Sequence, residues 1–384
     1  MTTMVENKDK KVLNVPHLRF PEFSGEWEKC KFKDVCKVGT GNKNTQDKVE
    51  DGLFPFYVRS QNIERINSWS FEGEAILTAG DGAVGKVFHY SIGKIGVHQR
   101  VYILSDFKCD GKYLYQYFSS HFYNRVKRLS AKNTVDSVRM EMITEMPLSL
   151  PSIEEQTKIG RLLSLLDERI ATQNKVIEDL KKLKSAIIEE HYKQSEKQSV
   201  PVADLGEPFS VSNLSKDDLT DTGTPCVIYG ELFTTYGEII NHVESYTKRS
   251  KGMTLSKKGD LLFPSSTTVD AVSLIAPSNI NVDNVILGGD MFGIHISSNY
   301  DAQYLSYYFN HIAKKQLAKY AKGSTIIHLH YKDIEKANLL LPCLKEQNKI
   351  AHNLILLDEK IHNENAYLQL MVKQKQYMLR HMFI

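Results

Sequence analysis

Two long stretches of the chain carry the same order of apolar and polar residues. The stretch over 151–190 recurs from residue 342 onward when 191 is added to each number (346 − 155). Glu155-Gln156 then meets Glu346-Gln347, and Leu165-Leu166-Asp167-Glu168 meets Leu356-Leu357-Asp358-Glu359. Self-similarity at a fixed spacing indicates a repeated architecture. Because this period is far too long for a solenoid, it predicts two units, each a globular domain followed by a helix.

Both copies have the apolar spacing of a helix that packs against another helix. The apolar series is Ile159, Leu163, Leu166, Ile170, Ile177, Leu180 and Ile187 in the first copy and Ile350, Leu354, Leu357, Ile361, Leu368, Met371 and Met378 in the second. Polar residues interrupt both series at matching places, Gln173 with Glu364 and Lys184 with Lys375. Heptad apolar spacing makes a coiled-coil seam, and polar seam residues fix its register. The matched interruptions favour two helices packed on each other over ordinary core helices.

The ends of these helices carry start signals of different strength. Ser152 followed by Glu155 after a proline forms a capping-box pattern, whereas the second copy has Cys343 at the equivalent place. We predict spacer helices over residues 152–193 and 343–384. At 1.5 Å per residue, each would be roughly 55–60 Å long.

The remaining residues predict two globular α/β halves and an α+β fold overall. In the first half, short β-like runs (54–58, 75–78, 86–90 and 100–104) precede a helical stretch over 113–129. The second half runs in similar order, and residues 301–309 echo residues 110–118. The segment 80–87 is expected to have no counterpart in 264–272. We predict a flexible leader at 1–14, one domain at 15–151 and another at 194–342.

Composition is that of an ordinary soluble protein. Of 384 residues, 41% are hydrophobic and 25% are charged, and the net charge of +3 permits an anionic partner without requiring one. Five cysteines without a C-x-x-C pair indicate reduced thiols. The first eleven residues have no apolar signal-peptide core, and no apolar run approaches the roughly 20 residues of a membrane-spanning helix. These features predict a cytoplasmic location.

No convincing catalytic, metal-binding or cofactor-binding pattern emerges. The segment 80–87 matches G-x-G-x-x-G, but Val87 stands where a P-loop needs Ser or Thr, and the following residues indicate a strand rather than a helix. We therefore expect a glycine-rich turn between strands. His328 and His330 share one face of a strand, where a polar contact is favoured over a metal site. The sequence predicts no bound cofactor and no metal.

Basic residues gather at matching places in the two halves. They are Arg125, Lys127, Arg128 and Lys132 in the first half and Lys314, Lys315, Lys319 and Lys322 in the second. Each cluster leads into a small polar loop. A solvated helix face would explain either cluster alone, but twin basic patches on twin domains suit a protein that contacts phosphates along DNA.

These residues together resemble the specificity subunits of type I restriction-modification enzymes. The resemblance is carried by residues 15–23 leading to Trp27, by residues 77–87, by Gln99-Arg100-Val101-Tyr102 and by the doubled Pro-x-x-x-Glu-Gln-x-x-Ile…Leu-Asp-x-x-Ile element. It covers nearly the whole chain. It implies two target-recognition domains, each reading half of a bipartite double-stranded DNA sequence, on two antiparallel coiled-coil helices that set the spacing.

The resemblance also implies partners and a role without catalysis of its own. Two methyltransferase subunits would dock on this frame, with restriction subunits completing the complex, and no membrane would be involved. Two alternatives remain: a stand-alone DNA-modifying enzyme, which lacks the expected motifs, and a coiled-coil scaffold without nucleic acid, which leaves two dissimilar domain surfaces unused.

Polar and basic side chains in turn regions are the predicted DNA contacts, because such side chains can reach groove edges. Lys132, Lys248 and Arg249 are expected to meet phosphates. The full predicted set is Arg59, Gln61, Asn62, Lys86, His98, Gln99, Arg100 and Lys132 in the first half and Tyr229, Thr234, Tyr236, Lys248, Arg249, Ser266, Thr267, His328 and His330 in the second.

Overall fold

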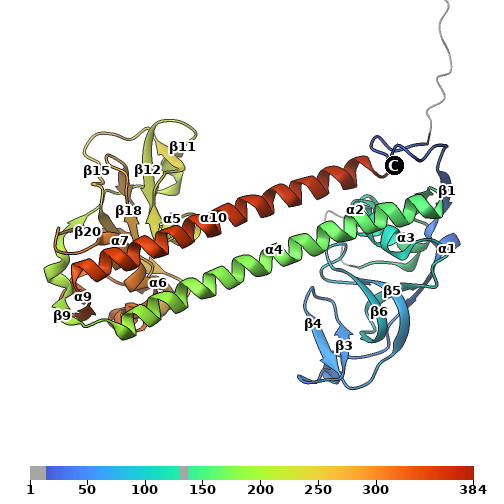
Figure 1. Ribbon diagram of the computed structural model, residues 1–384, viewed down its shortest axis with the longest axis horizontal. Coiled ribbons are helices and arrows are strands. Elements are labelled where there is room, and N and C mark those ends of the chain that lie inside the picture. The colour runs from blue at the N-terminus through green and yellow to red at the C-terminus, as the bar shows by residue number, and fades with distance from the viewer. Residues whose placement is uncertain (1–13, 130–136) are drawn as a thin grey trace, which may run out of the picture. The chain divides into compact units, whose positions relative to one another are not determined.

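The computed structural model describes residues 14–129 and 137–384, and the chain forms two compact units (Figure 1). Unit 1 comprises Met1–Asn174 and Ala366–Ile384, and unit 2 comprises Lys175–Asn365. The predicted helices are present as α4 (Ile153–Gln194) and α10 (Leu344–His381). Each unit therefore contains one stretch of α4 and one of α10. The predicted α+β class is confirmed, whereas the boundaries of the recognition domains stay a prediction.

Unit 1 is built on a six-stranded sheet in the order β2-β7-β5-β6-β3-β4. The strands are β2 (Lys37–Thr40), β3 (Phe54–Tyr57), β4 (Ile63–Ile66), β5 (Phe71–Ala79), β6 (Phe88–Val97) and β7 (Val101–Ser105). The sheet curls, so that the end of β6 returns to the start of β7: His98 N donates to Tyr57 O, and Val101 N donates to His98 O. Separately, β1 (Glu28–Lys31) pairs with β8 (Pro147–Leu150).

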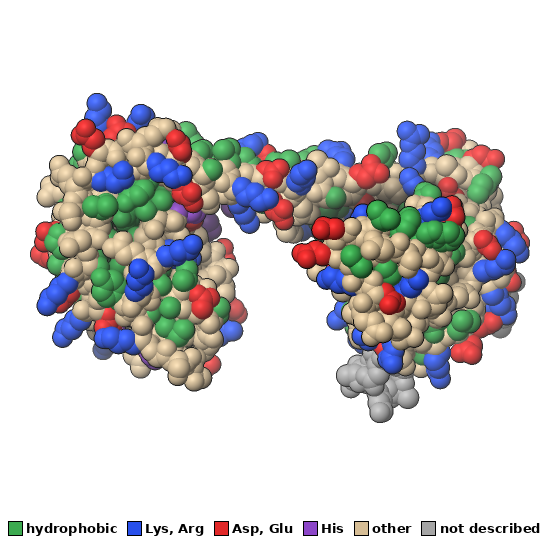
Figure 2. Space-filling view, turned by 90° about the horizontal axis from the view of Figure 1, so that it is seen from below, with side chains coloured by type: hydrophobic (Ala, Val, Ile, Leu, Met, Phe, Trp, Pro, Cys, Tyr) green, Lys and Arg blue, Asp and Glu red, His purple; other side chains and the backbone are tan. Residues whose placement is uncertain are grey.

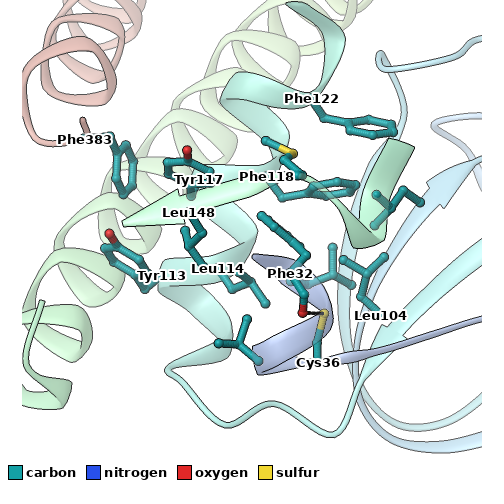
Figure 3. Packing of buried hydrophobic residues seen from close by; sticks show 14 of the residues in the cluster. Phe32, Cys36, Leu104, Tyr113, Leu114, Tyr117, Phe118, Phe122, Leu148 and Phe383 are labelled. Atoms are coloured by element: carbon teal, nitrogen blue, oxygen red, sulfur yellow. Dashed lines mark hydrogen bonds between the residues drawn. The ribbon is translucent and has the colours of Figure 1, made fainter. Parts of the chain in front are cut away.

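The core of unit 1 lies between this sheet and the helix α2 (Gly111–Leu129). Leu114, Phe118, Phe122 and Val126 recur every four residues, share one helix face and are fully buried. Figure 3 shows Phe383, which follows α10, lying against α2, and its ring centroid is 5.3 Å from that of Tyr113. The short helices α1 (Phe32–Val35) and α3 (Met140–Thr144) close the same core.

Unit 2 has two five-stranded sheets, ordered β10-β20-β16-β18-β13 and β11-β14-β12-β19-β15. The first comprises β10 (Gly206–Ser210), β13 (Ile239–Ile240), β16 (Asp260–Pro264), β18 (Ser278–Ile280) and β20 (Met291–Ile296). The second comprises β11 (Leu219–Thr220), β12 (Thr224–Ile228), β14 (Ser245–Thr247), β15 (Thr254–Leu255) and β19 (Ile286–Gly288). Two further pairs join β17 (Ser266–Thr267) to β21 (Ile327–His328) and β9 (Gln198–Pro201) to β22 (Asn338–Leu341).

Helices cover the sheets of unit 2 and supply its core. The helix α7 (Ala302–Tyr308) continues through a π-helical turn at Phe309–Ala313 into α8 (Lys314–Leu317), and three further single-turn α-helices lie in the same unit. These are α5 (Glu231–Thr234), α6 (Ala271–Leu274) and α9 (Tyr331–Ile334). Tyr304, Leu305, Tyr307 and Phe309 are fully buried against the sheets and against Leu354 of α10.

The sequence repeat is a repeat of hydrogen bonds. In unit 1, the Gln156 side chain accepts from Asp110 N and donates to Pro151 O. In unit 2, the Gln347 side chain accepts from Asp301 N and donates to Pro342 O, an identical arrangement 191 residues later. Both glutamines are buried, so each needs these partners. The invariant part of each unit is thus the junction between a long helix and the helix that covers the sheet.

The start of α4 differs in one respect from the predicted capping box. The Ser152 hydroxyl accepts from Glu155 N, as a cap should. The Glu155 carboxylate, however, is 1% exposed and receives two hydrogen bonds from Arg19, at 2.8 and 2.7 Å. Arg19 lies in the segment that leads to Trp27, so this bidentate pair fastens the segment to the long helix.

Within each unit, the stretches of α4 and α10 run antiparallel. In unit 1, Asp167 of α4 is paired with Lys375 of α10, and Arg169 of α4 donates to the hydroxyl of Tyr367 of α10. A later residue of α4 therefore contacts an earlier residue of α10, as in an antiparallel pair. The seam residues Gln173 and Lys184 are 9% and 8% exposed. The polar interruptions of the first copy therefore face into the helix packing, whereas Glu364 and Lys375 of the second copy are partly buried.

Candidate nucleic-acid interface

Asp81 of unit 1 joins two arginines that are far apart in sequence. Its Oδ1 accepts from Arg59 Nη1 at 2.8 Å, and its Oδ2 accepts from Arg100 Nη1 at 2.6 Å. The carboxylate side chain is 17% exposed, whereas the two arginine side chains are 44% and 64% exposed. The trio therefore presents two guanidinium groups to solvent from one shielded carboxylate. Sequence reasoning proposed both arginines but missed Asp81.

The curl of the sheet brings these three residues together. Arg59 follows β3, Asp81 follows β5, and Arg100 precedes β7. Gly80 N donates to Arg100 O at 2.8 Å, and this bond holds the last two loops side by side. A Cβ on Gly80 would lie 2.9 Å from that same oxygen, so a larger residue would force the loops apart.

The charges around the trio are well defined. Burial alone would raise the pKa of Asp81, but the hydrogen bonds from Arg100 and Arg59 outweigh it and leave the pKa below its ordinary value. His98 is buried beside the trio, and its Nδ1 accepts from Arg100 N. Burial, followed by the nearby charge of Arg59, lowers the pKa of His98. At neutral pH the site holds two cations, one anion and a neutral imidazole.

The other predicted contacts of unit 1 divide into exposed and unavailable residues. Gln61, Asn62, Lys86 and Gln99 are exposed on loops. Lys132 lies outside the described residues. Arg125, from the predicted basic cluster, instead donates to Met142 O and Glu145 O and fastens α3, so the fold uses its guanidinium.

Unit 2 repeats the backbone of this site with different side chains. Ser265 N donates to Asp290 O, and Leu329 N donates to Ser265 O, as Gly80 N donates to Arg100 O and Val138 N donates to Gly80 O in unit 1. Likewise, Ser266 pairs with His328 as Asp81 pairs with Ser137. The list of equivalences is therefore Gly80 with Ser265, Asp81 with Ser266 and Arg100 with Asp290. The prediction that 80–87 has no counterpart in 264–272 is wrong at the backbone level, because strand pairing persists where side chains differ.

An open pocket of about 720 Å³ lies at this place in unit 2. Tyr229, which directly follows β12, and Asp290 both line it, and both are exposed. The polar residues Ser212, Asn213, Ser215 and Lys216 also line it. Where unit 1 carries a pair of cations around one carboxylate, unit 2 thus offers a carboxylate, a phenol, an amide and the ammonium group of Lys216. Asp290 was absent from the predicted set.

The remaining predicted contacts of unit 2 fall into separate groups. His328 and His330 have stacked rings, and Asp333 holds His330 together with Lys322. Arg249 donates to Asn213 O beside the pocket and reaches Asp218, while Lys248 is exposed. Ser266 and Thr267 form β17. Thr234 ends α5, and Tyr236 lines a second pocket against α10, away from the pocket that Tyr229 lines.

The glycine-rich segment is a turn between strands, as predicted. It is followed by β6 and not by a helix, so no helix N-terminus faces a phosphate there. Over residues 14–129 and 137–384, no group of three or more His, Cys, Asp or Glu side chains is arranged to hold a metal ion. Within the same residues, no helix is both long and apolar enough to cross a membrane.

Surface charge is mixed rather than segregated. On the face drawn in Figure 2, the lysine and arginine side chains of each unit are interspersed with aspartate and glutamate. This distribution agrees with a net charge of only +3. Any recognition of DNA by such a surface must depend on particular placed side chains more than on a broad positive field.

Comparison with known proteins decides the family. The model of the type I restriction modification DNA specificity domain matches residues 24–182 and again residues 194–376. The two matches together span most of the chain and follow its internal repeat. The chain belongs to this family. As a type I DNA specificity protein, it is a DNA target-recognition subunit.

Individual relatives agree with this assignment. The chain is 26% identical over 167 residues to the EcoDI specificity subunit of Escherichia coli, an alignment that covers 42% of this chain and 37% of that relative. It is 24% identical to the MjaVIII specificity subunit of Methanocaldococcus jannaschii, over 92% of this chain and 90% of that protein. A putative specificity subunit of Haemophilus influenzae is 21% identical over 91% and 93% of the two chains.

Solved structures show the same fold. The S subunit of the type I restriction-modification system of M. genitalium superposes with a TM-score of 0.67 at 16% identity, covering 96% of this chain and 99% of that one. A chain from a study of complex assembly of the type I system has a TM-score of 0.54 at 13% identity, over 92% and 96% of the two chains. The low identities limit this likeness to the arrangement of the backbone.

Proposed function

We propose that this chain reads a two-part DNA sequence and has no catalytic residues of its own. In this proposal, residues 15–151 read one half of the target and residues 194–342 read the other. The supporting observation is the combination of a repeated frame with unlike surfaces. Gln156 and Gln347 make identical bonds, whereas Arg100 of unit 1 is replaced by Asp290 in unit 2. One plan with different hydrogen-bonding groups is what two different half-sites require.

The proposed partners are double-stranded DNA, two methyltransferase subunits and the restriction subunits. The long helices support a scaffolding role, because they carry large apolar side chains that each unit leaves exposed. Leu165 of unit 1 and its counterpart Leu356 of unit 2 are 47% and 52% exposed. A matched pair of exposed leucines, 191 residues apart, suits the docking of two copies of one partner.

Among the proposed DNA contacts, the geometry separates two classes. Arg59, Arg100 and Tyr229 lie at strand ends beside one another or beside a pocket, and we assign them to base recognition. Lys248 and Arg249 lie on an exposed loop and are assigned to phosphate contacts. Loss of a base contact should cost about 1–3 kcal/mol at one position of the target, whereas loss of a phosphate contact weakens binding to all sequences alike.

A domain exchange tests this proposal. The chain is assembled with its methyltransferase subunits, and methylated adenines are mapped in host DNA. Residues 32–150 are then replaced by the equivalent region of a relative. One half of the methylated sequence should change while the other half stays the same. A change in both halves, or in neither, would contradict separate reading, and methylation or cleavage by the purified chain alone would contradict a role without catalysis.

A further inference from the structure

We propose that Asp81 is a positioning residue that holds Arg59 and Arg100 as a paired set of donors for the major-groove edge of guanine in the half-site read by unit 1. This inference rests on the proposed function, which names DNA as the ligand but no base. It assigns to the first half-site a guanine, and it assigns to Asp81 the task of aiming the groups that read it.

The two guanidinium groups have donors to spare. An arginine carries five N–H donors in a fixed fork. Arg59 and Arg100 each donate to Asp81 through a single Nη1. Within residues 14–129 and 137–384, neither guanidinium donates to any other side chain or backbone oxygen, so most of its donors face solvent. The carboxylate thus fixes the orientation of each guanidinium group and leaves its other N–H donors available to a ligand.

The carboxylate also argues against a phosphate ligand. Asp81 is only 17% exposed and places a negative charge between the two cations, so it offsets half of their attraction for an anion. A site selected for phosphate affinity would gain by losing that charge. A neutral base edge is not repelled by it, and hydrogen bonding to a base gains from side chains held in one orientation.

Guanine is the base whose major-groove edge carries two acceptors, O6 and N7, and an arginine fork matches them with two donors. Adenine and cytosine both present an amino donor on that edge, which would face the N–H groups of Arg59 or Arg100. His98, buried beside the trio with its Nδ1 occupied by Arg100 N, adds no competing acceptor from that nitrogen.

Unit 2 provides the internal contrast. The position of Arg100 is taken by Asp290, and the position of Asp81 is taken by Ser266, although the backbone bonds are the same. A carboxylate there accepts hydrogen bonds and cannot read O6 or N7. The guanine assignment therefore applies to the half-site of unit 1 alone.

The test uses the assembled methyltransferase complex and the two-part target mapped in host DNA. Each guanine of both half-sites is replaced in turn by 7-deazaguanine, which lacks the N7 acceptor. Affinity should fall about tenfold or more at one guanine in the unit 1 half-site. In the Asp81→Asn variant, affinity for the intact target should fall by a similar factor, and the same 7-deazaguanine substitution should then cost little more, because both changes remove one interaction.

The charge change supplies a second readout with the opposite sign. Asp81→Asn removes a negative charge, so affinity for unrelated DNA should stay the same or rise. The matched variant Glu64→Gln also removes one negative charge of unit 1, from an ion pair with Lys48, and should leave the guanine preference unchanged. Arg59→Lys and Arg100→Lys keep the charge but lose the fork, and each should weaken target binding while sparing unrelated DNA.

Two outcomes would overturn the inference. If Asp81→Asn strengthens binding to target and unrelated DNA alike, the arginines meet phosphates and the carboxylate is only a repulsive charge. If no guanine in the unit 1 half-site responds to 7-deazaguanine, guanine is not the base. Absence of any two-part methylated sequence would instead refute the proposed function itself. An unchanged melting temperature of Asp81→Asn shows that its effect is on positioning and not on folding. If that variant has a lower melting temperature, Arg59→Lys and Arg100→Lys test the inference in its place.

Discussion

Lys184 Nζ donates to Asp358 Oδ1 across 2.7 Å, and the chain makes this contact a second time with the roles exchanged. Lys375, which is Lys184 shifted by 191, is paired with Asp167, which is Asp358 shifted back by the same number. Each aspartate also accepts from the helix that covers its sheet, Asp358 from Tyr307 and Asp167 from Gln116. Each unit therefore joins its stretches of α4 and α10 by one lysine–aspartate ion pair, Lys375 with Asp167 in unit 1 and Lys184 with Asp358 in unit 2.

The two lysine–aspartate ion pairs should contribute unequally to stability. The Lys184 side chain is 10% exposed and also reaches Glu238, whereas Lys375 and Asp167 are 20% and 39% exposed. Lys184→Met should cost about 3–5 kcal/mol, because it removes the shared cation from Glu238, which is 17% exposed, and from Asp358. Lys375→Met should cost about 1 kcal/mol or less. Hydrogen exchange of peptides from α7 measures the effect of Lys184→Met, and hydrogen exchange of peptides from α2 measures that of Lys375→Met. Equal losses of protection would contradict this ranking.

Stability of unit 2 should depend on pH through Glu238. Burial alone would raise the pKa of this carboxyl, but the hydrogen bond from His311 and the charge of Lys184 outweigh it and lower the pKa to about 2. The pKa of a glutamate in an unfolded chain is about 4.3. A folded-state pKa below the unfolded one contributes stability that is present above pH ~4.3 and is lost as pH falls toward ~2.

The measurement is the difference in the free energy of unfolding between the native chain and Glu238→Gln, followed by circular dichroism in urea. The difference should be largest and constant between pH 6 and 7, by linkage. It should shrink steadily as pH falls from about 5 to 3. A difference that grows with acid would show that the carboxyl is not held in its charged form.

The bidentate pair of Arg19 and Glu155 should be a main fastening of the segment that leads to Trp27. Arg19→Met leaves a carboxylate that is 1% exposed without its partner, at a cost of about 3–5 kcal/mol. Trp27 is 3% exposed and Trp69 is 44% exposed, so a Trp69→Phe background makes Trp27 fluorescence the reporter. The double variant Arg19→Met with Glu155→Met should recover part of the loss. If the single variant unfolds at the same urea concentration as the background, the pair is not a fastening.

The glycines of the segment 80–87 should tolerate substitution unequally. Gly82 and Gly85 both have positive φ, +69° and +65°, so alanine at either position is strained by about 1–2 kcal/mol. A Cβ on Gly82 meets nothing within 4 Å, whereas a Cβ on Gly85 would lie 2.9 Å from Cα of Tyr123 in α2. Gly85→Ala should therefore lower the melting temperature more than Gly82→Ala does. Equal effects would mean that contact with α2 does not select glycine.

The two long helices and their junctions with the domains could be predicted from the sequence, because the repeated side chains make the same contacts in both units. Gln156 and Gln347 must be glutamine to satisfy buried backbone groups, so their identity survives in both copies. Lys184 and Lys375 interrupt the apolar series because each has an aspartate to meet. The helix α2 was expected over 113–129 and spans Gly111–Leu129, since its four-residue apolar spacing leaves little choice.

Less of the candidate site could be predicted from the sequence, for two physical reasons. Arg59 and Arg100 come together only because the sheet curls, and no single strand pattern encodes that curvature. The equivalence of Gly80 with Ser265 rests on backbone bonds, which leave no trace in residue type. Arg125 shows the converse failure, because a basic residue within a basic cluster proved to be a structural donor to α3.

The division of the chain into Met1–Asn174 with Ala366–Ile384, and Lys175–Asn365, has a consequence for synthesis on the ribosome. Unit 2 is continuous, so all of its contacts can form once residue 365 has emerged. Unit 1 begins first but lacks Met382 and Phe383 of its core until the end of α10 appears. At about 5–20 residues per second, the first-made domain waits on the order of ten seconds with that face uncovered. During that interval the apolar face that Met382 and Phe383 cover in the folded unit 1 is exposed to water.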